Sequence, residues 1–473
     1  MTINEPDSQI AEKLVDWTKN RDFISGTRAV KAKGEKYLPK ESEDQSDWAY
    51  RAYKQRVTFY AAAERTLQGY MGLIFRHQPV LQASETMDLL CQAITPDGKT
   101  LEQLSSEIVS ETFQTNYSGL FIDHPPVRPG LSAANAVAQG YRPFINHYRA
   151  ETILGVEVGV IRNRKVLTRV RLLEEGGDRV RELLLRDGVY EVIVHNRSSS
   201  GQWVAEAPIR PLSRGKPLDH IPFVVVSTQN THLPTKGLLD ETIELNHQHY
   251  LNQGFLASTH YYTAAPIPVV IGAEAPEGGW QISPGQCITI PERADGVEFG
   301  YWEFKGEGVE SIERERAHLE DLLARQGARV IASEKTAVEA AETHSIRRAS
   351  ENAVLAQVAR SVSLHITKAL EMVARWIGDT EEVSFALNTD YLPDKMDSQA
   401  ITALVKAWQA GAFSHETLFL ALRDGEVFNE TLTFEEEQER MKREKALTEG
   451  MGGRQASPIA QNPTDPLQDS SED

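Results

Sequence analysis

The sequence predicts an α+β protein. Apolar residues recur at three- and four-residue spacing in several long segments, which is typical of amphipathic helices. A block of short Val- and Ile-rich runs at 152–227, separated by turns such as EEGGD and RDG, predicts antiparallel strands. Hydrophobic residues make up 40% of the chain and charged residues 25%, which is enough for a core and ordinary for a globular protein.

Length and charge limit the kinds of protein this chain can be. At roughly 150 residues per domain, the 473 residues suggest several folding units. The formal net charge of −18 is unlike that of proteins that grip nucleic acid by its phosphates, which are basic on the gripping face. Any contact with DNA is therefore expected to involve a few Lys or Arg positions only.

The chain is expected to be soluble and made inside the cell. Its first residues, MTINEPDSQIAEKLVDW, are acidic and lack the apolar stretch of a signal peptide. No apolar run approaches the ~20 residues that span a bilayer, so we expect no membrane partner. Cys91 and Cys287 are far apart and match no metal-binding spacing, and neither a metal nor a cofactor is expected.

The N-terminal third is predicted to be mostly helical. Residues 1–45 are polar, with one short helix expected around 11–17. Helical spacing then runs from 48 to 75. A further helix is expected at 100–115, with Thr100 as its N-cap.

Helical spacing returns after the strand block. The segment 237–262 is predicted to be a helix that stops before Pro266 and Pro268. Short strands at 266–304 and a charged helix at about 309–328 follow. Residues 331–344 have no large apolar side chain beyond Val338, which predicts a loop with little to fix it.

The C-terminal part is predicted to begin with a long helix. It runs from about Ser345 to Ile377 on a continuous apolar stripe, and Gly378 follows as the terminating residue. Two short helices and one charged helix come next. The Gly/Pro/Ser/Asp-rich tail at 447–473 is expected to be disordered.

The chain carries no motif for catalysis. The Gly-Lys-Thr of 98–100 lacks the glycine five residues earlier that a phosphate loop needs, because position 93 is Ala. His247 and His249 would point to different sides of a helix and cannot hold one ion from one face. Without a catalytic constellation, no enzyme activity is expected.

Two charged clusters have both an ordinary and a functional interpretation. Residues 307–321 hold six acidic side chains against two arginines, which fits a solvated helix face or the acidic wall of a channel. A basic group around the loop fits a helix-end cluster, a subunit contact or a DNA contact. Its members are Arg325, Arg329, Lys335, Arg347 and Arg348.

The order of these elements resembles the portal proteins of tailed bacteriophages. More specifically, it resembles a portal-like family catalogued as a domain of unknown function. The resemblance covers about Tyr50 to Glu444 and depends most on TAVEAAETHSIRRASENAVLAQVA and on the ending GAFSHETL. It depends on order and spacing, since no single motif in it is catalytic.

The resemblance implies a portal fold that assembles as a dodecameric ring around a DNA channel. It divides the chain as follows: wing 1–236, first stem helix 237–264, β-rich clip 265–308, second stem helix 309–330, tunnel loop 331–345, long kinked wing helix 346–378, wing and small crown 379–446, and disordered tail 447–473. In the family the clip docks the packaging motor and later the head–tail adaptor.

The resemblance also implies which residues act. Those of the tunnel loop are Ser333, Glu334, Lys335, Thr336, Glu339, Glu342 and Thr343. Those of an acidic channel wall are Glu310, Glu313, Glu320 and Asp321. A subunit interface or loop anchor is expected at Arg325, Arg329, Arg347 and Arg348, with this role favoured over a DNA grip for the last two.

The implied partners are those of a virion portal vertex assembled in a bacterial cytoplasm. They are further copies of the chain, double-stranded DNA bound without sequence specificity, the terminase large subunit, a head–tail adaptor and the major capsid or scaffold protein. The alternative that the sequence leaves open is a helical adaptor or scaffold protein of the phage head without a DNA channel.

Overall fold

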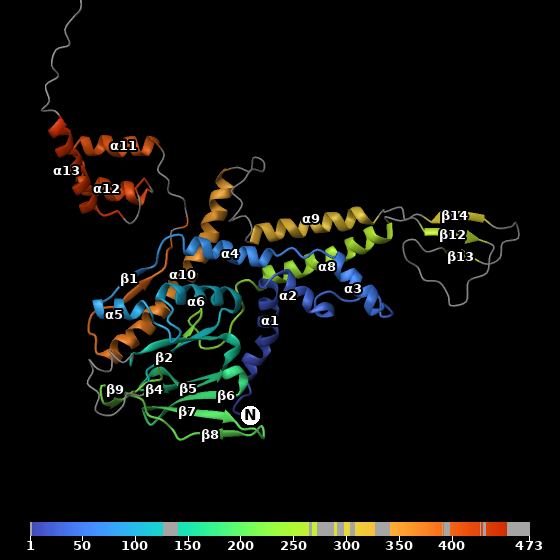
Figure 1. Ribbon diagram of the computed structural model, residues 1–473, viewed down its shortest axis with the longest axis horizontal. Helices are drawn as coiled ribbons and strands as arrows, with labels where there is room; N and C mark the ends of the chain where they lie inside the picture. The colour runs from blue at the N-terminus through green and yellow to red at the C-terminus, as the bar shows by residue number, and fades with distance from the viewer. Residues whose placement is uncertain are drawn as a thin grey trace, which may run out of the picture. The chain divides into compact units, whose positions relative to one another are not determined.

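A computed structural model gives the fold of the chain (Figure 1). It describes residues 2–125, 141–263, 267–271, 288–290, 298–302, 308–326, 341–389, 391, 398–425, 427–428 and 432–451. Within these, the backbone alone is described for 267–271, 288–290, 298–302, 341–351, 398–399, 424 and 444–451. The chain forms two compact units, Met1–Tyr391 and Leu392–Asp473.

The first unit begins with more helix than the sequence predicts. Helix α1 spans Ser8–Ile24, and its packing against the core extends it beyond the short helix expected at 11–17. The predicted helix at 48–75 is two helices, α3 (Asp47–Arg56) and α4 (Ala62–Ile74), because the backbone is extended at the fully buried Val57. The shorter elements here are α2 (Thr27–Ala32), the 3₁₀ turn η1 (Gly34–Lys36) and α5 (Glu85–Cys91).

The predicted helix with Thr100 as its N-cap is confirmed as α6 (Leu101–Thr115). The Thr100 hydroxyl accepts a hydrogen bond from the Gln103 backbone N–H, and the Gln103 side chain accepts one from the Thr100 backbone N–H. This capping box satisfies two backbone donors that a helix start leaves free.

The predicted antiparallel meander is confirmed as a five-stranded sheet in the order β4-β5-β6-β7-β8. Its strands are β4 (Ile153–Ile161), β5 (Arg164–Glu174), β6 (Arg179–Arg186), β7 (Val189–Arg197) and β8 (Trp203–Ala205). Short 3₁₀ turns lie before β4, η2 (Ala150–Thr152), and before β6, η3 (Glu175–Gly177). One face of this sheet packs on α1 through a cluster that includes Trp17, Val170 and Val192.

The last strand of the predicted block does not belong to the meander. β11 (Phe223–Val226) pairs with β2 (Ser118–Asp123), which also pairs with β3 (Phe144–Arg149). All four β11 residues are buried, so the strand lies under the helices and not at an exposed edge. β9 (Leu212–Ser213) and β10 (Lys216–Pro217) form a small separate hairpin.

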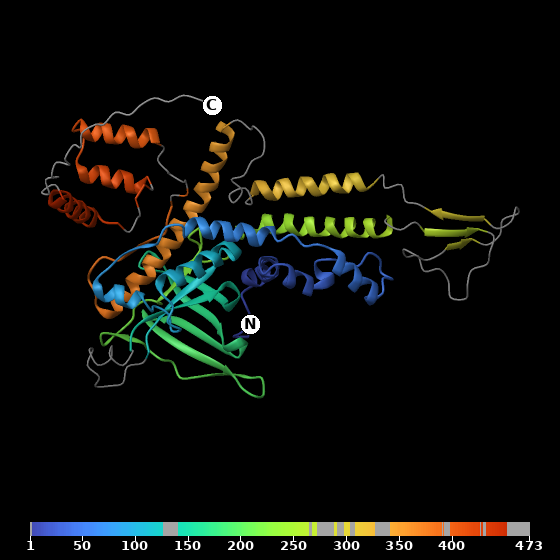
Figure 2. The same ribbon diagram turned by 45° about the horizontal axis from the view of Figure 1, so that its top comes forward.

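After the sheets come two helices that run side by side (Figures 1 and 2). They are α8 (Asp240–Thr263) and α9 (Val309–Gln326). In the chain between them lies a three-stranded sheet of β12 (Ile267–Ile271), β13 (Ile288–Ile290) and β14 (Glu298–Trp302), with β12 in the centre. The predicted helix–strands–helix order is confirmed.

The long predicted helix is α10 (Ala341–Ile377), and it runs through the core of the unit. Its buried stripe is Leu355, Val358, Val362, Ile366, Ala369, Leu370 and Val373. Gly378 ends it at φ +82°, and the N–H groups of Gly378 and Asp379 both donate to the Ala374 carbonyl. Beyond it, β15 (Ser384–Ala386) pairs with β1 (Val80–Gln82), two strands that the sequence pattern does not reveal.

The second unit is helical, as predicted, with α11 (Ser398–Gln409), α12 (His415–Asp424) and α13 (Phe434–Met451). The predicted start of the disordered tail, at 447, is too early. Helix α13 continues to Met451 through residues that favour helix, such as Leu447 and Glu449. Residues 452–473 lie outside the described part. No described helix of either unit is long and apolar enough to cross a membrane.

Candidate functional site

Helix α8 is buried on two sides, which explains its residue pattern. On one side Asn246 is fully buried, where its Nδ2 donates to the Tyr60 carbonyl at 2.7 Å and its Oδ1 accepts from the Ala63 N–H at 3.1 Å. Gly254 lies there too, where an added Cβ would come 2.3 Å from the Tyr53 hydroxyl. These contacts fix α8 to the N-terminal helices, and its opposite side is left for α9.

Polar side chains of α8 and α9 contact each other, and α9 also buries Leu319 and Leu323. His249 Nε2 lies 3.2 Å from Glu320 Oε1, and Asn252 Nδ2 donates to the Ile312 carbonyl at 3.4 Å. Thr242 Oγ1 donates to Gln326 Oε1 at 3.4 Å. Because residue numbers rise along α8 as they fall along α9, the helices are antiparallel. We call these contacts the polar seam.

The four residues assigned to an acidic channel wall do not form one uniform surface. Glu310 and Glu313 are exposed. Glu320 faces His249 across the polar seam, and Asp321 pairs with Arg325 at 2.5 Å. The helical period places Arg314 and Arg325 on the same outer face as Glu310 and Asp321, so this face is mixed in charge.

Two of the three histidines of α8, His247 and His249, point in different directions, as the sequence predicts. His247 contacts the rings of Phe23 and Tyr37, and burial lowers its pKa. His249 lies in the polar seam with its side chain 2% exposed. Helix α9 covers His249 there. Among the described residues, no group of His, Cys, Asp and Glu is arranged to hold a metal.

Most residues assigned to the tunnel loop and its anchor lie outside the described residues. These are Arg329, Ser333, Glu334, Lys335, Thr336 and Glu339. Glu342 and Thr343 belong to α10, not to a loop, because α10 begins at Ala341 in a segment rich in the strong helix formers Ala and Glu. Arg347 and Arg348 are also in α10, and their side chains are not described. Only Arg325 is placed, and its described ion pair is within its own helix.

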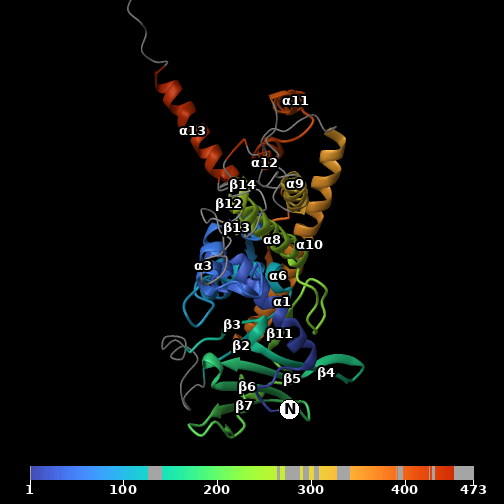
Figure 3. The same cartoon turned by 90° about the vertical axis from the view of Figure 1, so that its right-hand side faces the viewer.

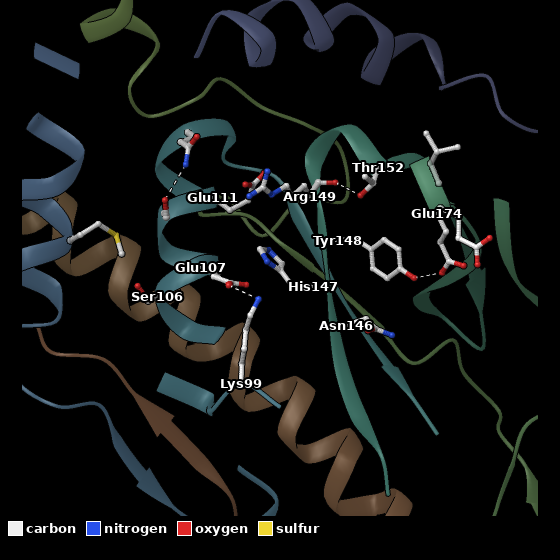
Figure 4. Close-up of a pocket in the computed structure, with 15 residues that line it drawn as sticks. Lys99, Ser106, Glu107, Glu111, Asn146, His147, Tyr148, Arg149, Thr152 and Glu174 are labelled. Carbon is white, nitrogen blue, oxygen red and sulfur yellow. Dashed lines mark hydrogen bonds and ion pairs between the residues drawn. The ribbon is translucent and has the colours of Figure 1, made fainter. Parts of the chain in front are cut away.

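A groove of about 830 Å³ lies where α6 meets β3 (Figure 4). Several of its charged residues form ion pairs with neighbours. Lys99 pairs with Glu107 at 2.7 Å, and Glu174 with Arg181 at 2.8 Å. The Tyr148 hydroxyl donates to Glu174, and burial is the main cause that raises the pKa of that hydroxyl.

Below this groove, Glu111 accepts hydrogen bonds from Arg21 and from the Ala150 N–H, and Arg21 also pairs with Glu151 at 2.9 Å. This network ties α1 and α6 to the start of the sheet. His147 faces the same place, and burial lowers its pKa. No described serine or cysteine in the groove is hydrogen-bonded to a histidine, so its geometry fits structural ion pairing better than nucleophilic catalysis.

The comparisons with known proteins fall on the α8–α10 segment. Residues 239–377 match the family DUF4055, described as a domain of unknown function. The match contains α8, the β12–β14 sheet, α9 and α10. The predicted relation to a family catalogued as a domain of unknown function is therefore confirmed over this segment. No curated protein matches the chain.

Solved structures that resemble the chain include chains from gene transfer agent (GTA) particles. A chain from the neck of an empty GTA particle, computed with C6 symmetry, is 12% identical at a TM-score of 0.40 and covers 76% of this chain and 89% of its own. A chain from the virion of the native particle is 11% identical at 0.39, over 84% and 98%. A native neck chain, computed with C12 symmetry, is 11% identical at 0.37, over 76% and 89%. This likeness is too low to transfer a role.

Proposed function

We propose that this chain is the portal protein of a tailed phage or phage-like particle. Copies of it form a ring at one capsid vertex, and double-stranded DNA passes through the ring during packaging and ejection. The observation that carries the proposal is the arrangement of α8, the β12–β14 sheet and α9. Two antiparallel helices that carry a small sheet between them in the chain are the expected stem and clip of a portal subunit.

The charge of the chain suits a channel that DNA slides through. At a net charge of −18, the chain as a whole repels phosphate, so contacts with the DNA backbone are expected at a few Lys or Arg positions only. Such contacts carry no sequence information, which fits a pore that passes a whole genome. The outer face of α9, with its mixed acids and arginines, supplies the stem part of the channel.

The other implied partners follow from the same arrangement. The β12–β14 sheet docks the terminase large subunit during packaging and the head–tail adaptor afterwards. The second unit forms a small crown, and the ring contacts the capsid or scaffold protein. The chain has a structural role and no enzyme activity, which agrees with the groove chemistry described above.

Electron micrographs of the purified chain test the proposal. We expect rings with a central hole and, in mass measurements, a single closed oligomer near twelve copies, as the resemblance implies. Monomers or dimers at every concentration and salt would contradict it. Compact oligomers without a hole would favour an adaptor or scaffold protein of the phage head that encloses no DNA.

A further inference from the structure

The β4–β5 hairpin extends past the rest of its sheet. Arg169 is the first residue of β5 that pairs with β6, so residues 164–167 pair with β4 alone, and Thr168 lies at a register shift between the two stretches. Figure 3 shows the two strands reaching out at the side of the unit, at the right of the view. Isolated two-stranded hairpins are only marginally stable in water. A projecting one therefore gains most from a partner that covers it.

The projecting part is apolar where a free hairpin would be polar. Val158, Val160 and Ile161 are 37%, 69% and 40% exposed. All three lie on β4, which is an edge strand of the sheet. Edge strands with exposed apolar side chains tend to pair with or pack on another chain.

The tip of the hairpin is cationic. Its two-residue turn, Arg162 and Asn163, has φ values of +50° and +62°. Turns of this kind prefer Asn, Asp or Gly, and an arginine with positive φ is uncommon. Arg162, Arg164 and Lys165 are exposed, and none of them pairs with a described carboxylate. The tip therefore presents three exposed cations with no described carboxylate partner.

The same chemistry continues onto neighbouring elements. Burial lowers the pKa of His232, and the charges of Lys165 and Lys368 lower it further. Leu233, next in the chain, is 46% exposed, and Leu364, one turn before Lys368 on α10, is 44% exposed. We call Val158, Val160–Lys165, Leu233, Leu364 and Lys368 the hairpin surface.

We propose that the hairpin surface docks on an acidic surface of a second copy of this chain. The proposal rests on the ring proposed above, for which it names the contact surface. Subunit interfaces combine apolar side chains at the centre with a charged rim, which is the composition of this surface. A surface that only held DNA phosphates would need the cations but not the exposed valines and isoleucine. The chain as a whole is acidic, with a net charge of −18, so a second copy offers carboxylates to these unpaired cations.

One described surface of the chain has the opposite charge and a matching apolar residue. Trp48, at the start of α3, is 73% exposed, and the exposed Glu43 and Asp44 lie just before it in the chain. Figure 3 shows α3 and the β4–β5 hairpin on opposite sides of the unit. Two unlike surfaces on opposite sides of a subunit give the head-to-tail contact that closes a ring.

Zero-length crosslinking between isotopically labelled and unlabelled chains is the first test. A carbodiimide reagent joins a lysine Nζ to a carboxylate that touches it. We expect mixed-label crosslinks from Lys165 or Lys368 to an Asp or Glu, with those around Glu43 and Asp44 the most frequent. Crosslinks from these lysines that form only within a chain would overturn the proposal.

Charge reversal is the second test. Arg162→Glu with Arg164→Glu is compared with Arg214→Glu and Lys216→Glu on the β9–β10 hairpin. That hairpin has a similar turn with positive φ at Arg214 and Gly215, and its tip lies beside Gly378. We expect the first pair to lower the assembled fraction at least tenfold in sedimentation velocity, and the second to change it less than twofold. Unchanged circular dichroism shows that both variants fold.

The outcomes separate this proposal from the portal proposal. Normal rings from R162E/R164E would overturn the hairpin contact and leave the ring intact. Equal losses from both variants would overturn it too, because the effect would then come from charge in general. A wild-type chain that crosslinks through Lys165 but forms no rings would support the contact and contradict the portal proposal.

Discussion

Helices α9 and α10 both belong to the family-matched segment, yet they are held in opposite ways. α10 runs through the core and buries a continuous apolar stripe from Leu355 to Trp376. α9, which is described throughout, buries only Leu319 and Leu323 and meets α8 through the polar seam. Apolar burial is the larger stabilising force, since one fully buried leucine side chain is worth about 1.5–3 kcal/mol. We therefore expect α10 to be a firmly packed strut and α9 to contribute less to the stability of the unit.

The strongest way to test this contrast is to remove apolar volume from α10. Leu370 is fully buried, and Leu370→Ala is expected to lower the free energy of unfolding of the first unit by about 4 kcal/mol, within the range for core leucines. Urea denaturation measures the effect. The matched control is Leu89→Ala, at a leucine that is 62% exposed, and it should change stability by less than about 0.5 kcal/mol. Equal losses of stability from both variants would contradict the prediction that α10 is a firmly packed strut.

A pH titration probes the same helix. Burial is the main cause that lowers the pKa of His365 on α10 to about 4 from an ordinary value of 6.5. The unfolded chain therefore binds this proton at a higher pH than the folded chain does. Stability falls as the pH drops from 6.5 toward 4, by about 3 kcal/mol from this residue.

The variant His365→Gln isolates that contribution. It cannot take up the proton, so its urea midpoint should fall less steeply than that of the wild type between pH 6.5 and 4. The substitution also lowers the free energy of unfolding by a constant amount at all pH values. The reason is that it removes the contact between His365 Nδ1 and the Ser361 carbonyl, which are 2.6 Å apart. A constant difference between the two proteins across the range would show that His365 does not titrate as expected.

A smaller effect is expected where α9 is least polar. Leu323 is 1% exposed, and Leu323→Ala should cost about 2 kcal/mol, at the low end for buried leucines because two surface helices can close partly over the gap. Hydrogen exchange should localise the loss to α9. A cost as large as that of Leu370→Ala would mean that α9 is as firmly packed as α10.

The smallest effect is expected in the polar seam. Glu320 is 49% exposed, and its bond to His249 is partly screened by water, so Glu320→Gln should cost less than about 1 kcal/mol. Exchange rates of α9 amides give a second readout, and they should rise only slightly. A loss of several kcal/mol in the free energy of unfolding would show that the polar seam fixes α9 firmly. The contrast between α9 and α10 would then not hold.

The sequence alone was sufficient where the signal is local. The period of apolar residues located α8, α9 and α10, the hydroxyl of Thr100 predicted the start of α6, and Gly378 predicted the end of α10. These features depend on residues within about one or two helical turns of each other, so a single segment contains all the information. The direction of His247 away from His249 follows from the helical period in the same way.

Only the tertiary structure decided which distant segments meet. β11 follows the meander in the chain but pairs with β2, and β15 pairs with β1, about three hundred positions earlier. The burial of His249 and the pairing of Arg21 with Glu111 likewise need elements far apart in the chain. Strand pairing and buried ion pairs depend on which surfaces meet when the core forms. The spacing of residues within one segment does not specify which distant segment it will contact.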